Sequence, residues 1–216
     1  MNRRQPERPM ADVHIGIDLD NTIIDYEDAF ATVAERVGLL PAGSQLRSKA
    51  AVKTRLRELG GEEAWMRLQG QLYGRYIEEA RLQPGVETFL SRMRAAGVRM
   101  TVISHKTRHG HFDAERVDLW QAARDFLDRR GFFATDGFGF APGDVVFEET
   151  RAAKVARIAA LGCTIFIDDL PEVLLDPAFP AATERLWYAP DHPPPIAGLG
   201  LGRDWLELVD IAGARI

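Results

Sequence analysis

Residues 13–23 read VHIGIDLDNTI, and this stretch decides which fold the chain can adopt. A short apolar run ends in the acids Asp18 and Asp20, which is the pattern of a buried strand that reaches a polar edge. The segments VRMTVIS at residues 98–104 and CTIFID at residues 163–168 have the same character. Stretches with helical spacing separate these strands. The alternation predicts an α/β fold with a Rossmann-like, three-layer core, in which helices cover both faces of a mostly parallel sheet.

The chain after the first strand breaks this alternation, because it is helical throughout. Gly60 and Gly61 separate two of the three helices that are predicted there, at residues 27–37, 46–59 and 62–82. We therefore predict an inserted α-helical cap at residues 25–83. The core is then formed by residues 13–24 and 84–216.

The remaining segments complete the predicted core. Residues 1–12 are polar, contain two prolines and predict a flexible tail. Further helices are predicted at residues 86–96, 113–130, 149–161 and 205–211, and further strands at residues 145–147 and 185–188. The stretch GLGLG at residues 198–202 lacks the spacing of a dinucleotide-binding motif, and it predicts a flexible loop.

The composition indicates a globular chain without a strongly charged surface. Of its 216 residues, 46% are hydrophobic and 27% are charged, which suits one ordinary domain or a core with a modest insertion. The net charge of −5 argues against nucleic acid as the main partner, because binding a phosphate backbone needs concentrated positive charge. No apolar run approaches the length of a membrane span, so we expect no membrane partner. The sequence leaves the oligomeric state open.

The single cysteine, Cys163, excludes an internal disulfide. Its neighbours predict a strand, so a buried free thiol is the favoured interpretation. A lone thiol suits a reducing compartment, and we expect a cytoplasmic protein.

Polar side chains stand at the ends of the predicted strands, where open α/β sheets bind their ligands. They are four acids, a hydroxyl and a lysine that precedes the last of these strands: Asp18, Asp20, Ser104, Asp168, Asp169 and Lys154. Several carboxylates packed together repel one another and need compensating charge. Magnesium supplies it, because this ion prefers carboxylate oxygens, water and substrate phosphate as ligands. The lysine offsets further charge.

Each of these residues taken alone has a simpler interpretation. An acid or a serine at a strand end commonly caps the next helix, and a lysine such as Lys154 commonly lies on a solvated helix face. A site is predicted by the combination, because acids, a hydroxyl and a lysine occur together at or just before the ends of successive strands.

This joint pattern resembles the haloacid dehalogenase superfamily. GIDLDNTI at residues 16–23 is similar to its first motif, hhhhDxDxT, and TVIS at residues 101–104 is similar to its second. Lys154 fits the third motif, and FIDDLPE at residues 166–172 fits the fourth. The resemblance covers residues 13–174 and implies a phosphatase with a small helical cap of the C1 type. Two positions depart from the usual fourth motif, namely Ile167 in place of Gly and Glu172 in place of Asp.

The resemblance also implies roles for individual residues. Asp18 would attack phosphorus to form an aspartyl-phosphate, and Asp20 would act as the general acid and base. The presence of Asp20 favours phosphoester chemistry over dehalogenation, since a halide leaving group needs no proton. Mg²⁺ would be held by Asp18, Asp20 through its backbone carbonyl, Asp168 and Asp169, and the pattern leaves open how Asp168, Asp169 and Glu172 divide this work. Phosphate would be bound by Ser104, Lys154, Leu19 and Thr22.

The expected substrate is a small phosphorylated metabolite, selected by the cap. His105 and Lys106 follow the second motif directly and are candidate substrate contacts. Aromatic residues of the cap, such as Trp65 and Tyr73, either meet the substrate or form the cap's own core. Two alternatives share the fold, namely a phosphotransferase or phosphomutase and a catalytically silent binding module.

Overall fold

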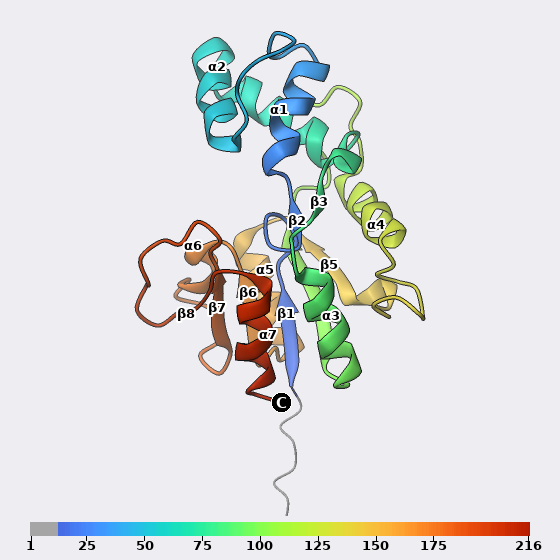
Figure 1. Ribbon diagram of the computed structural model, residues 1–216, viewed down its shortest axis with the longest axis vertical. Coiled ribbons are helices and arrows are strands. Elements are labelled where there is room, and N and C mark those ends of the chain that lie inside the picture. The colour runs from blue at the N-terminus through green and yellow to red at the C-terminus, as the bar shows by residue number, and fades with distance from the viewer. Residues whose placement is uncertain (1–12) are drawn as a thin grey trace, which may run out of the picture.

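A six-stranded parallel sheet lies at the centre of the molecule (Figure 1). The computed structural model describes residues 13–216, and the predicted tail at residues 1–12 lies outside the described residues. The strand order is β5 (Val145–Glu148), β4 (Arg99–His105), β1 (His14–Ile17), β6 (Ile165–Asp168), β7 (Glu184–Tyr188) and β8 (Gly200–Gly202). All neighbouring pairs are parallel. The predicted α/β architecture is confirmed, with β1 at the centre of the sheet.

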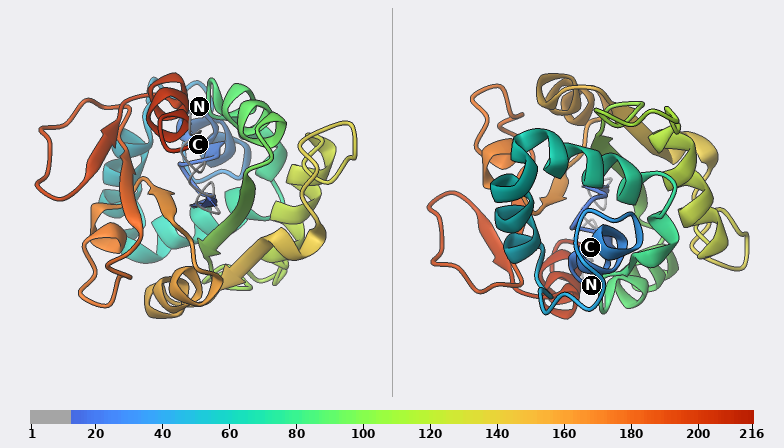
Figure 2. Two further views of the ribbon diagram at one scale, coloured as in Figure 1. Left: turned by 90° about the horizontal axis from the view of Figure 1, so that it is seen from below. Right: turned by 90° about the horizontal axis from the view of Figure 1, so that it is seen from above.

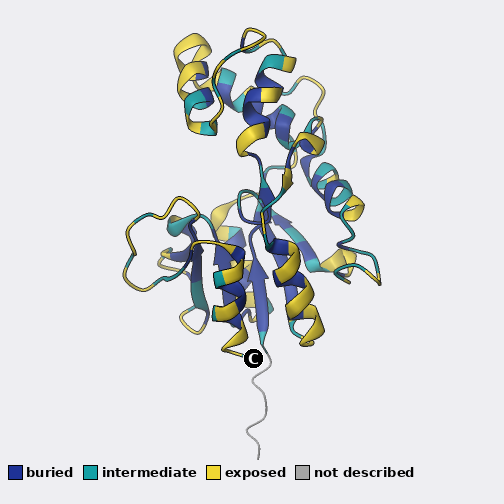
Figure 3. Ribbon diagram, in the orientation of Figure 1, coloured by how far each residue is buried: buried dark blue, intermediate teal, exposed yellow. Residues whose placement is uncertain are grey.

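Helices cover both faces of this sheet, as the end-on view shows (Figure 2). The two faces are covered by α3 (Val86–Ala95) and α7 (Trp205–Gly213) on one side and by α5 (Arg151–Leu161) on the other. Toward the two ends of the sheet lie α4 (Leu119–Arg129) and α6 (Pro171–Leu174). Every residue of β1 is buried, as expected for a central strand between two helical layers (Figure 3). Within residues 13–216, no helix is both long and apolar enough to span a membrane.

The helices inserted after β1 stand above the carboxyl ends of the strands (Figure 1). They are α1 (Glu27–Arg36), α2 (Lys49–Tyr73) and the 3₁₀ turn η1 (Ile77–Glu79), and a two-stranded ribbon of β2 (Ile24–Asp25) and β3 (Arg81–Leu82) joins them to the core. Trp65 stacks on Phe30 with ring centroids 4.9 Å apart, so this aromatic residue belongs to the interior of the cap. The arrangement places a lid directly over the site predicted from the strand ends.

The predicted helices at residues 46–59 and 62–82 are confirmed in their division at Gly60 and Gly61, and the predicted end at residue 82 is wrong. The segment α2 consists of two helical parts that meet at a kink at Gly60 and Gly61, and it ends at Tyr73. Gly61 has a φ of 67°, a left-handed conformation that favours glycine and separates the two helical parts. Ser48 begins the helix by accepting a hydrogen bond from the backbone N–H of Ala51.

The predicted helix at residues 113–130 begins later, at Leu119. Asp118 caps it and accepts hydrogen bonds from the backbone N–H groups of Trp120 and Gln121. Phe112 and Arg116 have positive φ angles, which a helix does not permit. The segment between β4 and α4 is therefore an irregular loop beside the cap.

The predicted flexible loop at residues 198–202 is wrong as well, because Gly200–Gly202 forms the edge strand β8. A side chain at Gly202 would meet Leu208 at 2.5 Å, and one at Gly200 would meet Leu186 at 2.6 Å. The glycines thus allow β8 to pack closely against the core.

Cys163 is a buried free thiol, as its apolar surroundings predict. Burial raises the pKa of this thiol to about 11. At neutral pH the group is protonated and behaves as a small apolar side chain.

Candidate active site

Three carboxylates meet at the carboxyl edge of the sheet. Asp18 follows β1, Asp168 ends β6, and Asp169 comes next in the chain. Ile17 pairs with Ile167 in the parallel register, which places Asp18 and Asp168 side by side. Oxygen atoms from the three side chains lie within 4.8 Å of one another. The acids predicted from separate strand ends therefore form one cluster.

Lys154 lies between two of these acids. Its side chain is completely buried, with Nζ 2.5 Å from Oδ1 of Asp18 and 2.6 Å from Oδ2 of Asp168. Burial alone would lower the pKa of Lys154, but the carboxylates of Asp168 and Asp18 outweigh it and raise the pKa. The ammonium group is therefore charged at neutral pH and holds the two acids together.

One ammonium group does not compensate three clustered carboxylates, two of which are buried. Burial raises the pKa of Asp168 to about 7, although Lys154 partly offsets this shift. The pKa of Asp169 is also raised, first by burial and then by the charges of Asp18 and Asp168. Three oxygen ligands whose negative charge exceeds the single positive charge of Lys154 fit a hard divalent cation such as Mg²⁺.

The turn after β1 fixes the orientation of Asp18. Asn21 adopts a φ of 63°, a left-handed conformation that asparagine tolerates better than most residues. This turn brings the Thr22 hydroxyl within 3.1 Å of Oδ2 of Asp18 and 3.2 Å of Oδ1 of Asp169. Thr22 thus contacts the acids through its side chain. The side chain of Leu19 is buried in the core, so only its backbone can face a phosphate.

Ser104 lies on the other side of Asp18. Its strand β4 pairs with β1, with Val102 opposite Ile17, so Ser104 lies two residues further toward the same edge. The hydroxyl is buried and has no hydrogen-bond partner among the described residues. A buried polar group without a partner is costly unless a ligand satisfies it.

Asp20 lies apart from the carboxylate cluster. The side chain of Asp20 is partly exposed, and Oδ1 accepts a hydrogen bond from the Tyr26 hydroxyl at 2.7 Å. Nζ of Lys106 lies 2.9 Å from the same oxygen. Both contacts are made by Oδ1, and neither involves Oδ2 of Asp20. Of the acids predicted as metal ligands, Asp20 alone has its carboxylate outside the cluster, so only its backbone carbonyl is a candidate ligand.

A pocket of about 220 Å³ opens beside Asp20, between the cap and the core. The cap contributes residues of α2, and the core contributes the loop that follows β4. The lining residues are Asp20, Met66, Gln69, Gly70, Tyr73, His105, Lys106, Thr107, Gly110, His111, Leu119 and Glu149. Both predicted substrate contacts, His105 and Lys106, thus face a space next to the acids.

No protein-family model matches the chain, and no curated protein matches it in sequence. Solved structures match it over almost their whole length. The HAD-hydrolase YfnB from Bacillus subtilis, bound to magnesium, is 14% identical with a TM-score of 0.58, and the match covers 92% of this chain and 97% of that one. A HAD-superfamily hydrolase of subfamily IA from Geobacter sulfurreducens PCA is 16% identical with a TM-score of 0.56, at 95% and 98% coverage. The chain has the haloacid dehalogenase fold.

A third solved structure with this fold is a predicted phosphoglycolate phosphatase from Haemophilus somnus 129PT. It is 16% identical with a TM-score of 0.55, and the match covers 94% of this chain and all of that one. Because coverage is nearly complete on both sides, the likeness includes the helices inserted after β1 as well as the sheet.

The cap and core of this haloacid dehalogenase fold touch at two glycines next to the pocket. A Cβ atom added at Gly110 would lie 2.5 Å from the Cα atom of Gly70 in α2. Both partners are backbone, so neither can move aside as a flexible side chain would. The close approach brings α2 against the loop after β4 and closes one wall of the pocket.

We expect Gly110→Ala to lower the free energy of unfolding by about 1–3 kcal/mol, because the added methyl group overpacks this contact. Urea denaturation monitored by circular dichroism measures the change. Gly143→Ala is the matched control, since a Cβ atom there meets nothing within 4 Å. Equal stabilities of the two variants would contradict a close cap–core contact at Gly110.

Two residues near the site, Tyr26 and Lys49, carry no signal in the sequence, and the cap aromatic Tyr73 is found at the pocket. Tyr26 binds Asp20, and Tyr73 lines the pocket. Lys49 donates a hydrogen bond to Oδ1 of Asn21 at 3.0 Å, and burial lowers its pKa. All three lie in or next to the cap, so their positions depend on how the cap sits on the core. Glu172, by contrast, is exposed and lies outside the acid cluster.

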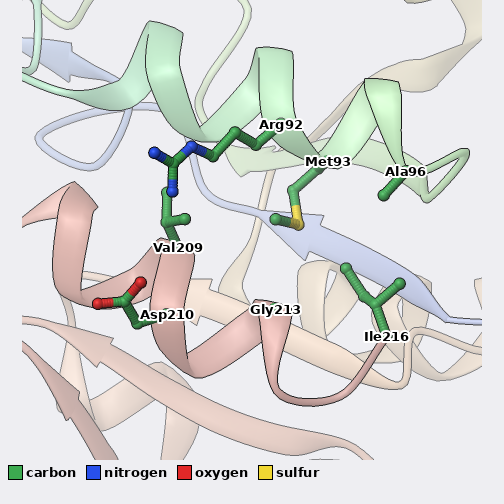
Figure 4. A pocket seen from close by; sticks show the side chains of 7 residues that line it. All are labelled: Arg92, Met93, Ala96, Val209, Asp210, Gly213 and Ile216. Carbon is green, nitrogen blue, oxygen red and sulfur yellow. The ribbon is translucent and has the colours of Figure 1, made fainter.

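A larger hollow of about 420 Å³ lies elsewhere, between α3 and α7 (Figure 4). Figure 4 shows Met93 and Ile216 facing it, with Arg92 and Asp210 at its rim. It lies toward the edge of the sheet where β1 begins, opposite the cap. Its lining lacks a cluster of acids, so the smaller pocket beside Asp20 is the candidate site.

Proposed function

We propose that this protein is a magnesium-dependent phosphomonoester hydrolase that acts through an aspartyl-phosphate on Asp18. The observation that carries the proposal is the position of Asp18. It follows the central strand, contacts Lys154 at 2.5 Å, and lies in a cluster with Asp168 and Asp169. A nucleophile, compensating positive charge and a candidate cation site thus occur together, which is what phosphoryl transfer requires.

Mg²⁺ would be held by the side chains of Asp18, Asp168 and Asp169 and by the backbone carbonyl of Asp20. When bound, the ion neutralises negative charge on the phosphoryl oxygens. Lys154 places a second positive charge at the same edge. The orphaned hydroxyl of Ser104 is suited to donate a hydrogen bond to a phosphoryl oxygen.

Two steps divide the reaction between two acids. In the first, a carboxylate oxygen of Asp18 attacks phosphorus, the bond to the ester oxygen breaks, and Asp20 donates a proton to the departing oxygen. In the second, Asp20 takes a proton from water, the water oxygen attacks phosphorus, and the bond to Asp18 breaks. Inorganic phosphate and free Asp18 result. The position of Asp20 at the pocket, outside the acid cluster, suits contact with the leaving group.

The pocket supports a small leaving group. Its volume is about 220 Å³, and residues of both the cap and the core line it. The cap covers the reacting centre and limits access of bulk water during the reaction. The substrate class that fits is a small phosphorylated metabolite.

A panel of small phosphomonoesters, assayed for phosphate release, tests the proposal. We expect release in the presence of Mg²⁺ and a loss of at least about 100-fold with a chelator, because a divalent cation supplies several kcal/mol of charge stabilisation. Adding Mg²⁺ in excess of the chelator restores activity.

The same panel separates hydrolysis from its alternatives. A phosphotransferase or phosphomutase would consume the ester and release little inorganic phosphate, which quantification of the acceptor product detects. Absence of turnover on every ester, with the protein folded and Mg²⁺ present, would contradict the proposal and favour a silent binding module.

A further inference from the structure

Lys106 is a buried cation at the wall of the pocket. Its side chain is only 3% exposed, yet it lines the 220 Å³ space beside Asp20. Nζ lies 2.9 Å from Oδ1 of Asp20 and 4.9 Å from the centre of the Tyr73 ring. Among the described residues, it makes no hydrogen bond of good geometry. An ammonium group has three N–H donors, and leaving them unsatisfied in a buried position is costly.

The other groups around the pocket do not duplicate this charge. Burial and the nearby charge of Lys154 lower the pKa of His105, which is therefore uncharged at neutral pH. His111 and Glu149 lie at the exposed rim. Lys106 is thus the one buried cationic side chain among the residues that line the pocket.

We propose that Lys106 selects substrates whose leaving group carries a carboxylate, and this inference rests on the function proposed above. A carboxylate would accept the unused N–H donors of Lys106 in charge-assisted hydrogen bonds. A substrate carboxylate also fits electrostatically. It would face the ammonium group of Lys106, which is paired with the carboxylate of Asp20.

The geometry limits where the carboxylate sits on the substrate. Asp20 meets the ester oxygen through Oδ2, and Lys106 meets the carboxylate through Nζ, which lies 2.9 Å from Oδ1 of Asp20. With one ordinary hydrogen bond at each end and the width of the Asp20 carboxylate between them, the two substrate groups lie no more than about 11 Å apart. A carboxylate on the first or second carbon from the ester oxygen satisfies this limit and fits the pocket.

A matched pair of esters tests this inference. 3-Phosphooxypropanoate carries a carboxylate on the second carbon, and propyl phosphate has a methyl group in its place. We expect wild-type protein with Mg²⁺ to show a kcat/KM about 10- to 100-fold higher for the carboxylate ester, which is the size of effect that a charged hydrogen bond produces. In Lys106→Met the two values should agree within about threefold.

Controls separate recognition from a structural role. Arg108→Met should keep the wild-type ratio, because Arg108 is in the same loop but is exposed, pairs with Asp118 and does not line the pocket. Lys106→Gln provides a polar replacement should the methionine variant unfold. Inhibition of wild-type protein by 3-hydroxypropanoate but not by 1-propanol, with propyl phosphate as substrate, tests the same contact without any variant.

The outcomes are distinct. Equal kcat/KM for the two esters in wild-type protein would overturn the inference while leaving the hydrolase function intact. An equal drop for both esters in the Lys106 variants would also overturn it, since a purely structural role of the Asp20 contact predicts that result. Failure of wild-type protein on every phosphomonoester would instead contradict the proposed function.

Discussion

Asp18→Asn will reduce phosphate release by at least about 1000-fold, because an amide does not replace a carboxylate as a nucleophile. The protein should stay folded, since the amide has the same shape and Lys154 keeps its contact with Asp168 at 2.6 Å. Removing the charge of Asp18 also relieves its repulsion of Asp168 and Asp169. Steady-state release of phosphate and thermal unfolding, measured on the same preparation, check both statements.

Asp128→Asn is the matched control for this substitution, because Asp128 lies on the exposed side of α4. It should keep wild-type turnover. An Asp18→Asn variant that retains more than a tenth of wild-type activity would rule out Asp18 as the nucleophile.

Lys154→Met will lower the free energy of unfolding by about 3–5 kcal/mol in metal-free protein at about pH 8, because it leaves buried acids without their cation. Mg²⁺ should recover part of this loss by replacing the missing charge. The loss should shrink toward about pH 5. An acid whose pKa is higher in the folded than in the unfolded chain keeps its proton on folding, so stability falls as pH rises. Urea denaturation with Mg²⁺ or with a chelator measures each effect.

Arg157→Met gives the control on the same helix. Arg157 pairs with Glu148 but is 45% exposed, so its loss should cost less than about 1 kcal/mol. Similar costs for Lys154→Met and Arg157→Met would show that the acid cluster does not depend on Lys154.

The strands of the core could be predicted because each is an apolar run with a polar end. The central strand can be predicted from this pattern alone, because a segment that is buried on both faces of the sheet is mainly apolar. Gly200–Gly202 was missed because an edge strand made of glycine and leucine has no such contrast. The division of α2 at Gly60 and Gly61 could be predicted because paired glycines interrupt a helix, whereas its end at Tyr73 was missed.

The grouping of Asp18, Asp168 and Asp169 also follows from the sequence, because parallel strands bring their carboxyl ends to one edge. The contacts of Asp20 do not follow from it. Tyr26 and Lys106 reach the same carboxylate oxygen from different segments, and nothing in their local sequence marks them as partners.

The sequence by itself determined five of the six strands of the main sheet, the polar groups at their ends and the presence of helices between residues 25 and 83. Local patterns of apolar and polar residues are enough for these features, because burial repeats with the period of each element. Only the tertiary structure decided how the cap meets the core, where Gly70 touches Gly110 and where Lys106 becomes a buried cation beside Asp20. Those contacts join segments far apart in the chain, and their geometry depends on the packing of whole elements.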